Sequence, residues 1–427
     1  MQAPSILHTS LRTKSIITKT TACRLCGSQR RTDVWSFGET PLANAYRTVE
    51  ELGQPEFVAP LTVARCEACQ LVQLRETVDP TVLFRDYLYV SSTSPTFVAH
   101  FDAYAAHLTE RFHLRAGTFV IDIGSNDGIL LKPLRARGVR ALGVEPVAHI
   151  ADRANAEGAE TLPAFFSRSL AREIRSRYGP ATVITANNVF AHMPDLDDAL
   201  QGVQELLAED GVCAFEVQYL GDLLEKNLFD IVYHEHLCYY HVAPLVPFFA
   251  RHGFELFDVQ RVPVHGGSIR VFVQRANGPH PTETRIQELL DAERAQGLHT
   301  LEPYRAFWQR VQTNKESLVR LLSHLRASGK RLAGYGAPAK ATTLLQTFGI
   351  GPETLEYIVD DDTKFKQGRY MPGSHIPIVA PERLYRDRPD ACLILAWNFA
   401  EPLMHTHRRF TQQGGRFIVP VPEPRIV

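Results

Sequence analysis

The feature that most constrains the fold of this chain is a strand, glycine turn and helix pattern that occurs twice. Residues 118–124 form an apolar run typical of a buried parallel strand, and residues 124–128 form a Gly-Ser-Asn-Asp-Gly turn into an apolar helix. Residues 330–343 repeat this order around Gly334 and Gly336. A chain of 427 residues is also longer than one hydrophobic core usually organises. The sequence therefore predicts an α/β protein of two or three domains, two of them doubly wound.

The first glycine turn has the features of a cofactor site. Glycines let the backbone approach a ligand, and the helix N-terminus that follows favours polar or anionic groups. A second strand at 141–144 ends in Glu145, where an acid can accept both hydroxyls of an adenosine ribose and is expected to make no core contact. A doubly wound domain without a cofactor is the alternative. The candidate cofactor residues are Asp122, Gly124, Asn126, Asp127, Glu145, Pro146, Asn187 and Asn188.

Further strands are expected at 181–186 and 211–217, followed by an antiparallel pair at 254–259 and 268–274. Ligands bind at the carboxyl ends of strands in open parallel sheets, and His192 stands at such an end. His192 is therefore a site candidate, although an isolated histidine is more often structural. The segment His265-Gly266-Gly267-Ser268 precedes the last strand and is either part of the site or only a turn.

The segment Tyr233-His234-Glu235-His236-Leu237-Cys238-Tyr239-Tyr240 carries the groups needed to remove a proton beside a carbonyl. A histidine titrates near neutrality, a glutamate can orient it, and tyrosine hydroxyls can stabilise an oxyanion. A packed aromatic loop and a zinc site built from the two histidines are the alternatives. The His-Glu-His spacing differs from the His-Glu-x-x-His helix of metalloproteases.

Two Cys-x-x-Cys pairs, Cys23 with Cys26 and Cys66 with Cys69, are separated by 39 residues. Each pair lets two thiolates approach Zn²⁺ at about 2.3 Å. A redox dithiol is the alternative, but neither pair stands between a strand and a helix. We expect one structural zinc whose closed coordination shell stabilises a small domain. Three further cysteines are expected to be reduced packing residues: Cys213, Cys238 and Cys392.

The overall charge excludes some classes of partner. A formal net charge of −1 gives no field that would attract nucleic acid or an anionic membrane. No apolar run reaches the roughly 18 residues of a membrane span, and the N-terminus lacks an apolar signal core. We therefore expect a cytoplasmic protein. Residues 1–20, basic and without an acid, are expected to form a tail or an amphipathic targeting segment.

The C-terminal part begins with a polar, helix-favouring stretch at 281–328 that is typical of a linker helix. The second doubly wound unit follows, with strands expected at 355–360, 391–396 and 415–420. Its glycine turn, with Tyr335 and Lys340, is a candidate nucleotide site. A domain that only supports the first unit is the alternative.

Together these motifs resemble the three-domain S-adenosylmethionine-dependent nucleotide-sugar C-methyltransferases, such as the TDP-sugar C-3′-methyltransferases that make branched deoxysugars. The resemblance covers nearly the whole chain and implies a zinc-binding domain in 1–80, a class I methyltransferase domain in 81–280 and a Rossmann-like domain in 281–427. The matching motifs are Cys23-x-x-Cys26, Cys66-x-x-Cys69, Asp122 to Gly128, Gly143 to Pro146, Tyr233 to His236, His265 to Ser268 and Gly334 to Lys340.

The resemblance also implies the roles of the site residues. His236 matches the base of the family, and Tyr233, Glu235, His192 and a tyrosine of the pair Tyr87 and Tyr89 would line the sugar site. His241 departs from the serine of the family pattern, which leaves the sugar open but not the chemistry. Candidates for contact with a TDP-linked substrate are Tyr239, His265, Gly267, Ser268, Tyr335 and Lys340.

The expected chemistry follows from what carbon methylation needs. A neutral C–H carbon has no lone pair for the methyl group of S-adenosylmethionine, so a base must first form an enolate beside a C4 ketone. His236 is expected to be this base, and Glu235 is expected to orient it or to bind a sugar substituent. Two alternatives remain open: methylation of oxygen or nitrogen in a small metabolite, and a non-catalytic zinc protein that binds a nucleotide sugar.

Overall fold

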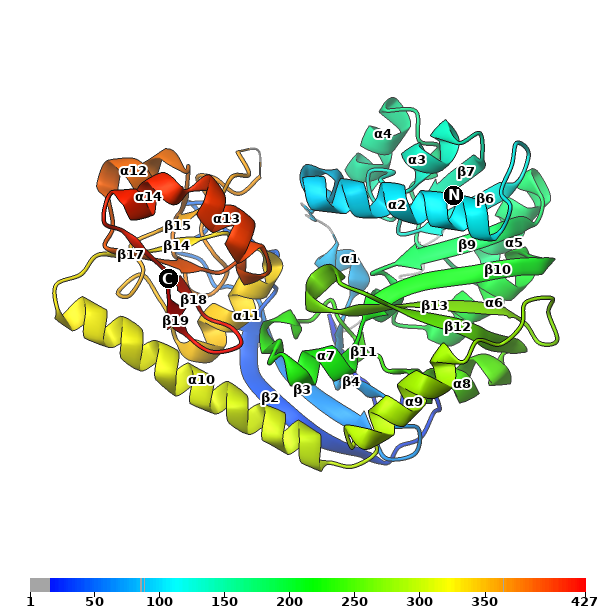
Figure 1. The fold of residues 1–427 in the computed structure, drawn as a ribbon, viewed down its shortest axis with the longest axis horizontal. Coiled ribbons are helices and arrows are strands. Elements are labelled where there is room, and N and C mark those ends of the chain that lie inside the picture. Colours follow the sequence, from blue (N-terminus) through cyan, green and yellow to red (C-terminus); the bar gives the residue numbers. More distant parts are fainter. Residues whose placement is uncertain (1–15, 85–86, 88, 364) are drawn as a thin grey trace, which may run out of the picture.

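The computed structural model describes residues 16–84, 87, 89–363 and 365–427 (Figure 1). The first fifteen residues of the expected tail lie outside the described residues. The central sheet has the strand order β12-β13-β10-β9-β6-β7-β8. Its strands are β6 (Phe119–Ile123), β7 (Arg140–Val144), β8 (Thr161–Leu162), β9 (Ala181–Asn187), β10 (Leu207–Gln218), β12 (Phe254–Val262) and β13 (Ser268–Arg275).

The neighbouring strands β10, β9, β6, β7 and β8 are parallel, and β13 pairs antiparallel with both β10 and β12. Alternate residues of β6 face opposite layers: Val120 packs in one apolar cluster and Ile121 in the other. The sheet therefore confirms the predicted doubly wound fold. Its helices include α2 (Pro95–Arg111), α3 (Leu131–Ala136), α4 (Ala148–Ala156), α5 (Arg168–Tyr178), α6 (Leu196–Leu206), α7 (Leu220–Glu225) and α8 (Val242–Arg251).

The N-terminal sheet has the order β11-β4-β3-β2, and a separate strand pair, β1 with β5, lies beside it. These strands are β1 (Ile17–Lys19), β2 (Arg31–Pro41), β3 (Val58–Cys66), β4 (Val72–Leu74), β5 (Glu76–Val78) and β11 (Cys238–Tyr239), and the short helix α1 (Pro80–Leu83) follows. The strand β11 belongs to the predicted catalytic segment and pairs Cys238 with Gln73. This pairing anchors the segment 233–240 to the N-terminal sheet.

The C-terminal sheet has the order β16-β15-β14-β17-β18-β19 and is parallel except for β19. Its strands are β14 (Leu332–Tyr335), β15 (Ile358–Val359), β16 (Ile378–Val379), β17 (Ala391–Ile394), β18 (Arg416–Val419) and β19 (Arg425–Ile426). Its helices are α11 (Ala339–Phe348), α12 (Glu382–Asp387), α13 (Ala400–Thr406) and α14 (Arg408–Gln412). This arrangement is the predicted second doubly wound unit.

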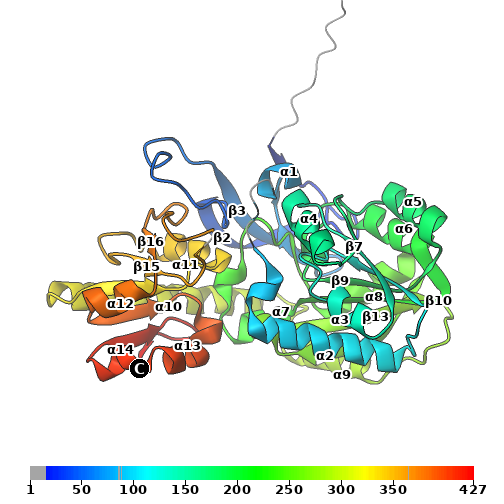
Figure 2. The same ribbon diagram turned by 90° about the horizontal axis from the view of Figure 1, so that it is seen from above.

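The linker holds two helices, α9 (Arg285–Ala295) and α10 (Glu302–Ala327), where the sequence indicated one. The long helix α10 packs on β2: the Trp35 indole donates to the Tyr304 carbonyl at 3.0 Å and its ring lies 4.6 Å from that of Phe307. In both ribbon views β2 and β3 lie between the central and the C-terminal sheets (Figure 2). Within the described part of the chain, no helix is both long enough and apolar enough to span a membrane.

Candidate active site

A cavity of about 1310 Å³ lies between the carboxyl ends of the parallel strands of the central and C-terminal sheets. From the central sheet it is lined by residues that end or follow strands, among them Gly124, Glu145 and Asn187. From the C-terminal sheet it is lined by Tyr335 and Asp360. Parallel sheets bind ligands at these ends, and here the two binding edges share one cavity.

The glycine turn after β6 is packed so closely that it has no room for a side chain at position 124. Gly124 has a φ of +67°, and a Cβ there would lie 2.2 Å from a methyl group of Val189. The Glu145 carboxylate accepts the backbone N–H of Asn126 at 3.0 Å and of Val147 at 2.9 Å. The expectation that Glu145 makes no core contact is therefore wrong, because its buried carboxylate holds the turn.

Asn187 offers an unused acceptor to the same part of the cavity. Its amide nitrogen donates to Asp122 at 3.3 Å, while its Oδ1 is buried without a partner among the described residues. Burial raises the pKa of Asp122 to about 7. A donor group on a bound ligand would satisfy Asn187, and Glu145 and Pro146 line the cavity beside it. These residues fit S-adenosylmethionine.

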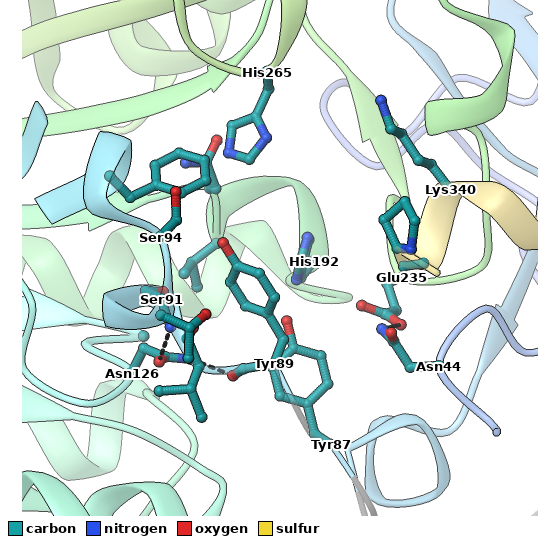
Figure 3. A pocket seen from close by; sticks show the side chains of 18 of the residues that line it. Asn44, Tyr87, Tyr89, Ser91, Ser94, Asn126, His192, Glu235, His265 and Lys340 are labelled. Carbon is teal, nitrogen blue, oxygen red and sulfur yellow. Dashed lines mark hydrogen bonds between the residues drawn. The ribbon is translucent and has the colours of Figure 1, made fainter. Parts of the chain in front are cut away.

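Asn126 and Asp127 fasten the segment before α2 to the glycine turn. The Asn126 side chain accepts the Ser91 N–H at 2.9 Å and donates to the Tyr89 carbonyl at 3.1 Å (Figure 3). Asp127 accepts the hydroxyl of Ser92 and does not line the cavity. The two side chains hold Tyr89 over the site.

His236 has the hydrogen bonding of a neutral base. Its Nδ1 lies 2.7 Å from the carbonyl oxygen of Ile231. A carbonyl can only accept, so Nδ1 carries the proton and Nε2 keeps the lone pair. Burial, reinforced by neighbouring His192, lowers the pKa of His236 well below its usual value. The ring lies 4.1 Å from that of Tyr233 and 5.0 Å from that of His192.

Glu235 does not orient this base, since Ile231 does. Its buried carboxylate instead accepts the side-chain N–H of Asn44 at 2.7 Å, from the N-terminal domain (Figure 3). Burial raises the pKa of Glu235 to about 7, against the effect of the Asn44 bond. Of the two expected roles, contact with a substrate substituent remains. Sequence reasoning missed Asn44, because a single asparagine 191 residues away carries no local signal.

His234 faces away from the cavity. Its Nε2 lies 3.2 Å from the Ala59 carbonyl and 3.3 Å from the Pro60 carbonyl, so it docks the segment on β3. The alternative of a zinc site made by the two histidines has no support here, because His234 bonds to carbonyls of β3 whereas His236 bonds to the Ile231 carbonyl and lines the cavity. Among the described residues, the four clustered cysteines form the group that could hold a metal ion.

The phenols divide into two groups. Tyr87, Tyr89 and Tyr233 line the cavity, and burial raises the pKa of Tyr87 and Tyr233 well above the usual value. Their hydroxyls therefore stay protonated and able to donate. Tyr239 is 2% exposed and lies outside the lining.

His241 also lies outside the cavity lining, fully buried at the start of α8. The histidine that replaces the serine of the family pattern therefore packs in the core and makes no direct contact with a ligand in the cavity. His192, His265, Asn188 and Lys340 do line the cavity, as do Tyr335 and Pro146. Five predicted site residues do not: Asp122, Asp127, Tyr239, Gly267 and Ser268.

Gly267 and Ser268 instead shape the turn that presents His265. A Cβ on Gly267 would lie 2.1 Å from a carboxylate oxygen of Asp222, and the Ser268 hydroxyl donates to the Val264 carbonyl at 3.1 Å. His265 has a φ of 53°, in the left-handed region, and faces the cavity. Burial lowers its pKa to about 4. The glycine pair is thus a structural turn next to a site histidine.

On the C-terminal edge, Lys340 donates to the side-chain oxygen of Asn398 at 2.7 Å, and its ammonium lies 3.4 Å above the Trp397 ring. Burial lowers the pKa of Lys340 to about 8. The Tyr335 hydroxyl lies 3.0 Å from Asp361 and 2.7 Å from Nε2 of His407. This edge offers two lysine ammonium groups, of Lys340 and Lys366, and several oxygen acceptors.

The four predicted zinc ligands lie together, with every sulfur within 4.8 Å of the others. The Cys23 to Cys69 distance is 3.5 Å and the Cys26 to Cys66 distance is 3.6 Å. A zinc ion with four sulfurs at about 2.3 Å separates them by about 3.8 Å, so the cluster fits a closed tetrahedral site.

Comparison with known proteins identifies the family of this chain. Family models match in chain order: a zinc binding domain at residues 23–84, a methyltransferase domain at 97–259 and a C-methyltransferase C-terminal domain at 263–422. The C-methyltransferase NovU of Streptomyces niveus is 40% identical over 405 residues, 95% of this chain and 96% of that protein. The chain belongs to the C-methyltransferase family. It is an S-adenosylmethionine-dependent enzyme with a zinc-binding N-terminal domain, and the alternatives of a non-catalytic scaffold and of oxygen or nitrogen methylation are set aside.

Solved structures show a more distant likeness. The magnesium protoporphyrin IX methyltransferase ChlM of Synechocystis PCC 6803 with bound S-adenosylmethionine is 15% identical, covers 42% of this chain and 79% of its own, and has a TM-score of 0.31. The YcgJ protein of Bacillus subtilis is 12% identical, covers 41% and 99%, and has a TM-score of 0.32. At such scores the likeness carries no weight for the function.

Proposed function

We propose that this enzyme methylates C3 of a TDP-linked 4-keto-deoxysugar, with His236 as the base. The observation that carries the proposal is the hydrogen bond from His236 Nδ1 to the Ile231 carbonyl, which leaves the Nε2 lone pair in a cavity lined by phenols. A histidine whose pKa is lowered by burial is neutral at physiological pH and therefore ready to accept a proton. The sugar, its nucleotide and the C3 position rest on the family resemblance.

The reaction has two steps at the sugar. His236 Nε2 takes the proton from the carbon next to the ketone, and the electrons of that C–H bond form an enolate whose charge lies on the ketone oxygen. The enolate carbon then forms the new carbon–carbon bond. When bound, S-adenosylmethionine would supply the methyl group for that bond and would leave as S-adenosylhomocysteine, whose sulfur keeps the electrons of the broken S–CH3 bond. The protonated imidazole then returns its proton to solvent.

The tyrosines supply the stabilisation of the enolate. Tyr87, Tyr89 and Tyr233 line the cavity, and the Tyr233 ring also lies tilted against the ring of His236, with 4.1 Å between the ring centres. A protonated phenol donates to a developing oxyanion in a site with little water, where such a bond is strongest. Glu235 faces the same cavity and would accept a hydroxyl or amino group of the sugar.

The nucleotide would lie along the C-terminal edge. Lys340 lies near the N-terminus of the ten-residue helix α11. A diphosphate there can contact both the lysine ammonium and the backbone N–H groups at the start of the helix. Asp360 and Asp361 would accept hydroxyl donors beside them. The cavity volume of about 1310 Å³ has room for a cofactor and a nucleotide sugar together.

The test separates carbon chemistry from binding. Wild-type enzyme with S-adenosylhomocysteine and a TDP-4-keto-6-deoxyhexose in heavy water should exchange the carbon-bound proton without methylation. The variant His236→Asn should lose both exchange and methyl transfer, by about 10²–10⁴-fold. His234→Asn is the matched control, since His234 faces away from the cavity.

Because the C4 ketone acidifies the protons on C3 and on C5, NMR of the exchanged sugar and of the product assigns the carbon. Methylation at C5 would overturn the C3 assignment and leave the base in place. Near-normal exchange by His236→Asn would overturn the assignment of the base, and His192, which lies 5.0 Å away in the same cavity, would take its place.

A further inference from the structure

We propose that Trp397 and Asp230, which connect the two doubly wound units, position the catalytic base His236. The inference rests on the proposed function, because it concerns the orientation of His236 during proton removal. Neither residue reaches the reacting carbon in this account. Asp230 lies in the turn Phe229–Ile231, and Ile231 of that turn provides the carbonyl that fixes the His236 tautomer.

Asp230 is a fully buried acid with one partner from the other unit. Its Oδ2 accepts the indole N–H of Trp397 at 2.5 Å, across 167 residues of sequence. Its Oδ1 has no hydrogen-bond partner among the described residues. Trp397 is the side-chain partner of this buried carboxyl, which Lys340 and the Asp230 backbone also influence, and losing the indole bond leaves the group poorly satisfied.

The rest of the turn is held by the same C-terminal unit. The Thr343 hydroxyl donates to the Val232 carbonyl at 2.8 Å, and the rings of Phe229 and Phe348 are stacked at 4.9 Å. Both Thr343 and Phe348 belong to α11, which packs on the turn. The carbonyl of Ile231 therefore has its position fixed from outside the central sheet.

Trp397 stands between two residues that line the nucleotide edge of the cavity, Ala396 and Asn398. Its ring is 3.4 Å from the Lys340 ammonium, and Lys340 in turn bonds Asn398, the residue next to Trp397. A ligand held by Lys340 would thus touch the same short segment, Trp397–Phe399, that holds Asp230. The segment Trp397–Phe399 therefore contacts both Asp230, beside the base, and Lys340, on the nucleotide edge.

The experiment compares Trp397→Phe with Trp308→Phe. The first keeps an aromatic ring but removes the N–H that Asp230 accepts. The second makes the same chemical change on α10, where Trp308 packs its ring on Phe37 at 5.0 Å outside the cavity. Steady-state kinetics, affinity for S-adenosylhomocysteine, thermal unfolding and deuterium exchange of a TDP-4-keto-6-deoxyhexose are measured for each variant.

We expect Trp397→Phe to lower kcat and the exchange rate together, on the order of 10- to 100-fold, with cofactor affinity unchanged. Asp230→Asn, which keeps an oxygen acceptor for the indole, should retain most of the activity. Equal exchange by Trp397→Phe and Trp308→Phe would overturn the inference, as would a loss that follows cofactor affinity or unfolding temperature. Absence of exchange in the wild type would instead overturn the proposed function.

Discussion

The side-chain amide of Asn44 donates to the carboxylate of Glu235 at 2.7 Å, across 191 residues of sequence. Two residues further on, the Tyr46 hydroxyl donates to the Ala337 carbonyl in the C-terminal glycine turn at 2.6 Å. A short loop of the zinc-binding domain therefore contacts both sides of the cavity. The N-terminal domain takes part in building the site, in addition to its zinc cluster.

Replacing Asn44 by alanine should weaken catalysis through Glu235. Loss of the donor removes a bond that favours the ionised carboxylate, so the pKa of Glu235 rises further above its usual value. Less of the carboxylate is then ionised at neutral pH. Bonds to charged groups contribute about 1.5–3 kcal/mol, so we expect kcat/KM to fall on the order of 10- to 100-fold.

The measurement is kcat/KM for the sugar against pH. In Asn44→Ala the acid side of the profile should move to higher pH, while the affinity for S-adenosylhomocysteine stays the same. An unchanged profile would show that Glu235 has no part in substrate binding or that Asn44 does not control its charge.

Glu145 should show two separable effects. Glu145→Ala leaves the N–H groups of Asn126 and Val147 without their acceptor, which should lower the free energy of unfolding by about 1–3 kcal/mol and weaken cofactor binding. Glu145→Gln keeps one oxygen, so it should weaken cofactor binding with a smaller loss of stability. Calorimetry with S-adenosylhomocysteine and thermal unfolding measure the two effects. Unchanged affinity in both variants would remove Glu145 from the cofactor site.

The sequence predicts those parts of this fold whose signal is local. The strand at Phe119–Ile123 follows from a continuous apolar run, and the Gly124 turn follows from residues that directly continue it. The cysteine pairs are readable for the same reason. In both knuckles the residue four places after the first cysteine, Gly27 or Gln70, has a positive φ and donates its N–H to that cysteine's carbonyl.

The parts that sequence reasoning missed depend on contacts between distant segments. The orientation of His236 is fixed by the backbone carbonyl of Ile231. Every residue type has such a carbonyl, so the sequence at position 231 does not indicate this role. The strand pairing of Cys238 with Gln73 involves too few residues to show a periodic pattern. The resemblance implies that Tyr239 contacts the substrate, but β-strand alternation and pairing place it in the core.

The zinc cluster should be required for activity as well as for stability. We expect one zinc per chain and its loss in Cys66→Ser, because three sulfurs no longer close the tetrahedral shell. Removal of zinc should loosen β2 and β3 and with them the loop that carries Asn44, so methylation should fall with metal content. Metal analysis and activity of the same samples test this. Cys213→Ser, far from the cluster, should keep its zinc, and full zinc in Cys66→Ser would contradict the assignment.

His241 should make the protein less stable in acid. Its ring is fully buried, neither nitrogen has a partner among the described residues, and burial lowers its pKa to about 3. The unfolded chain binds a proton below its usual pKa of about 6.5, whereas the folded chain does not. Stability is therefore unaffected by this group above pH 6.5 and is lost as the pH falls from there towards 3. Between pH 7.5 and 5.5 the loss amounts to about 1.4 kcal/mol.

The variant His241→Phe removes this titration and keeps a flat ring of similar shape. Its free energy of unfolding should fall less between pH 7.5 and 5.5 than that of the wild type, by about 1.4 kcal/mol. Any packing cost of the larger ring is the same at both pH values and cancels in this difference. The other buried histidines and the zinc cluster are common to both proteins, so their acid sensitivity cancels as well. Denaturant titrations at the two pH values measure the difference, and equal pH dependence in the two proteins would mean that His241 takes up its proton in the folded state.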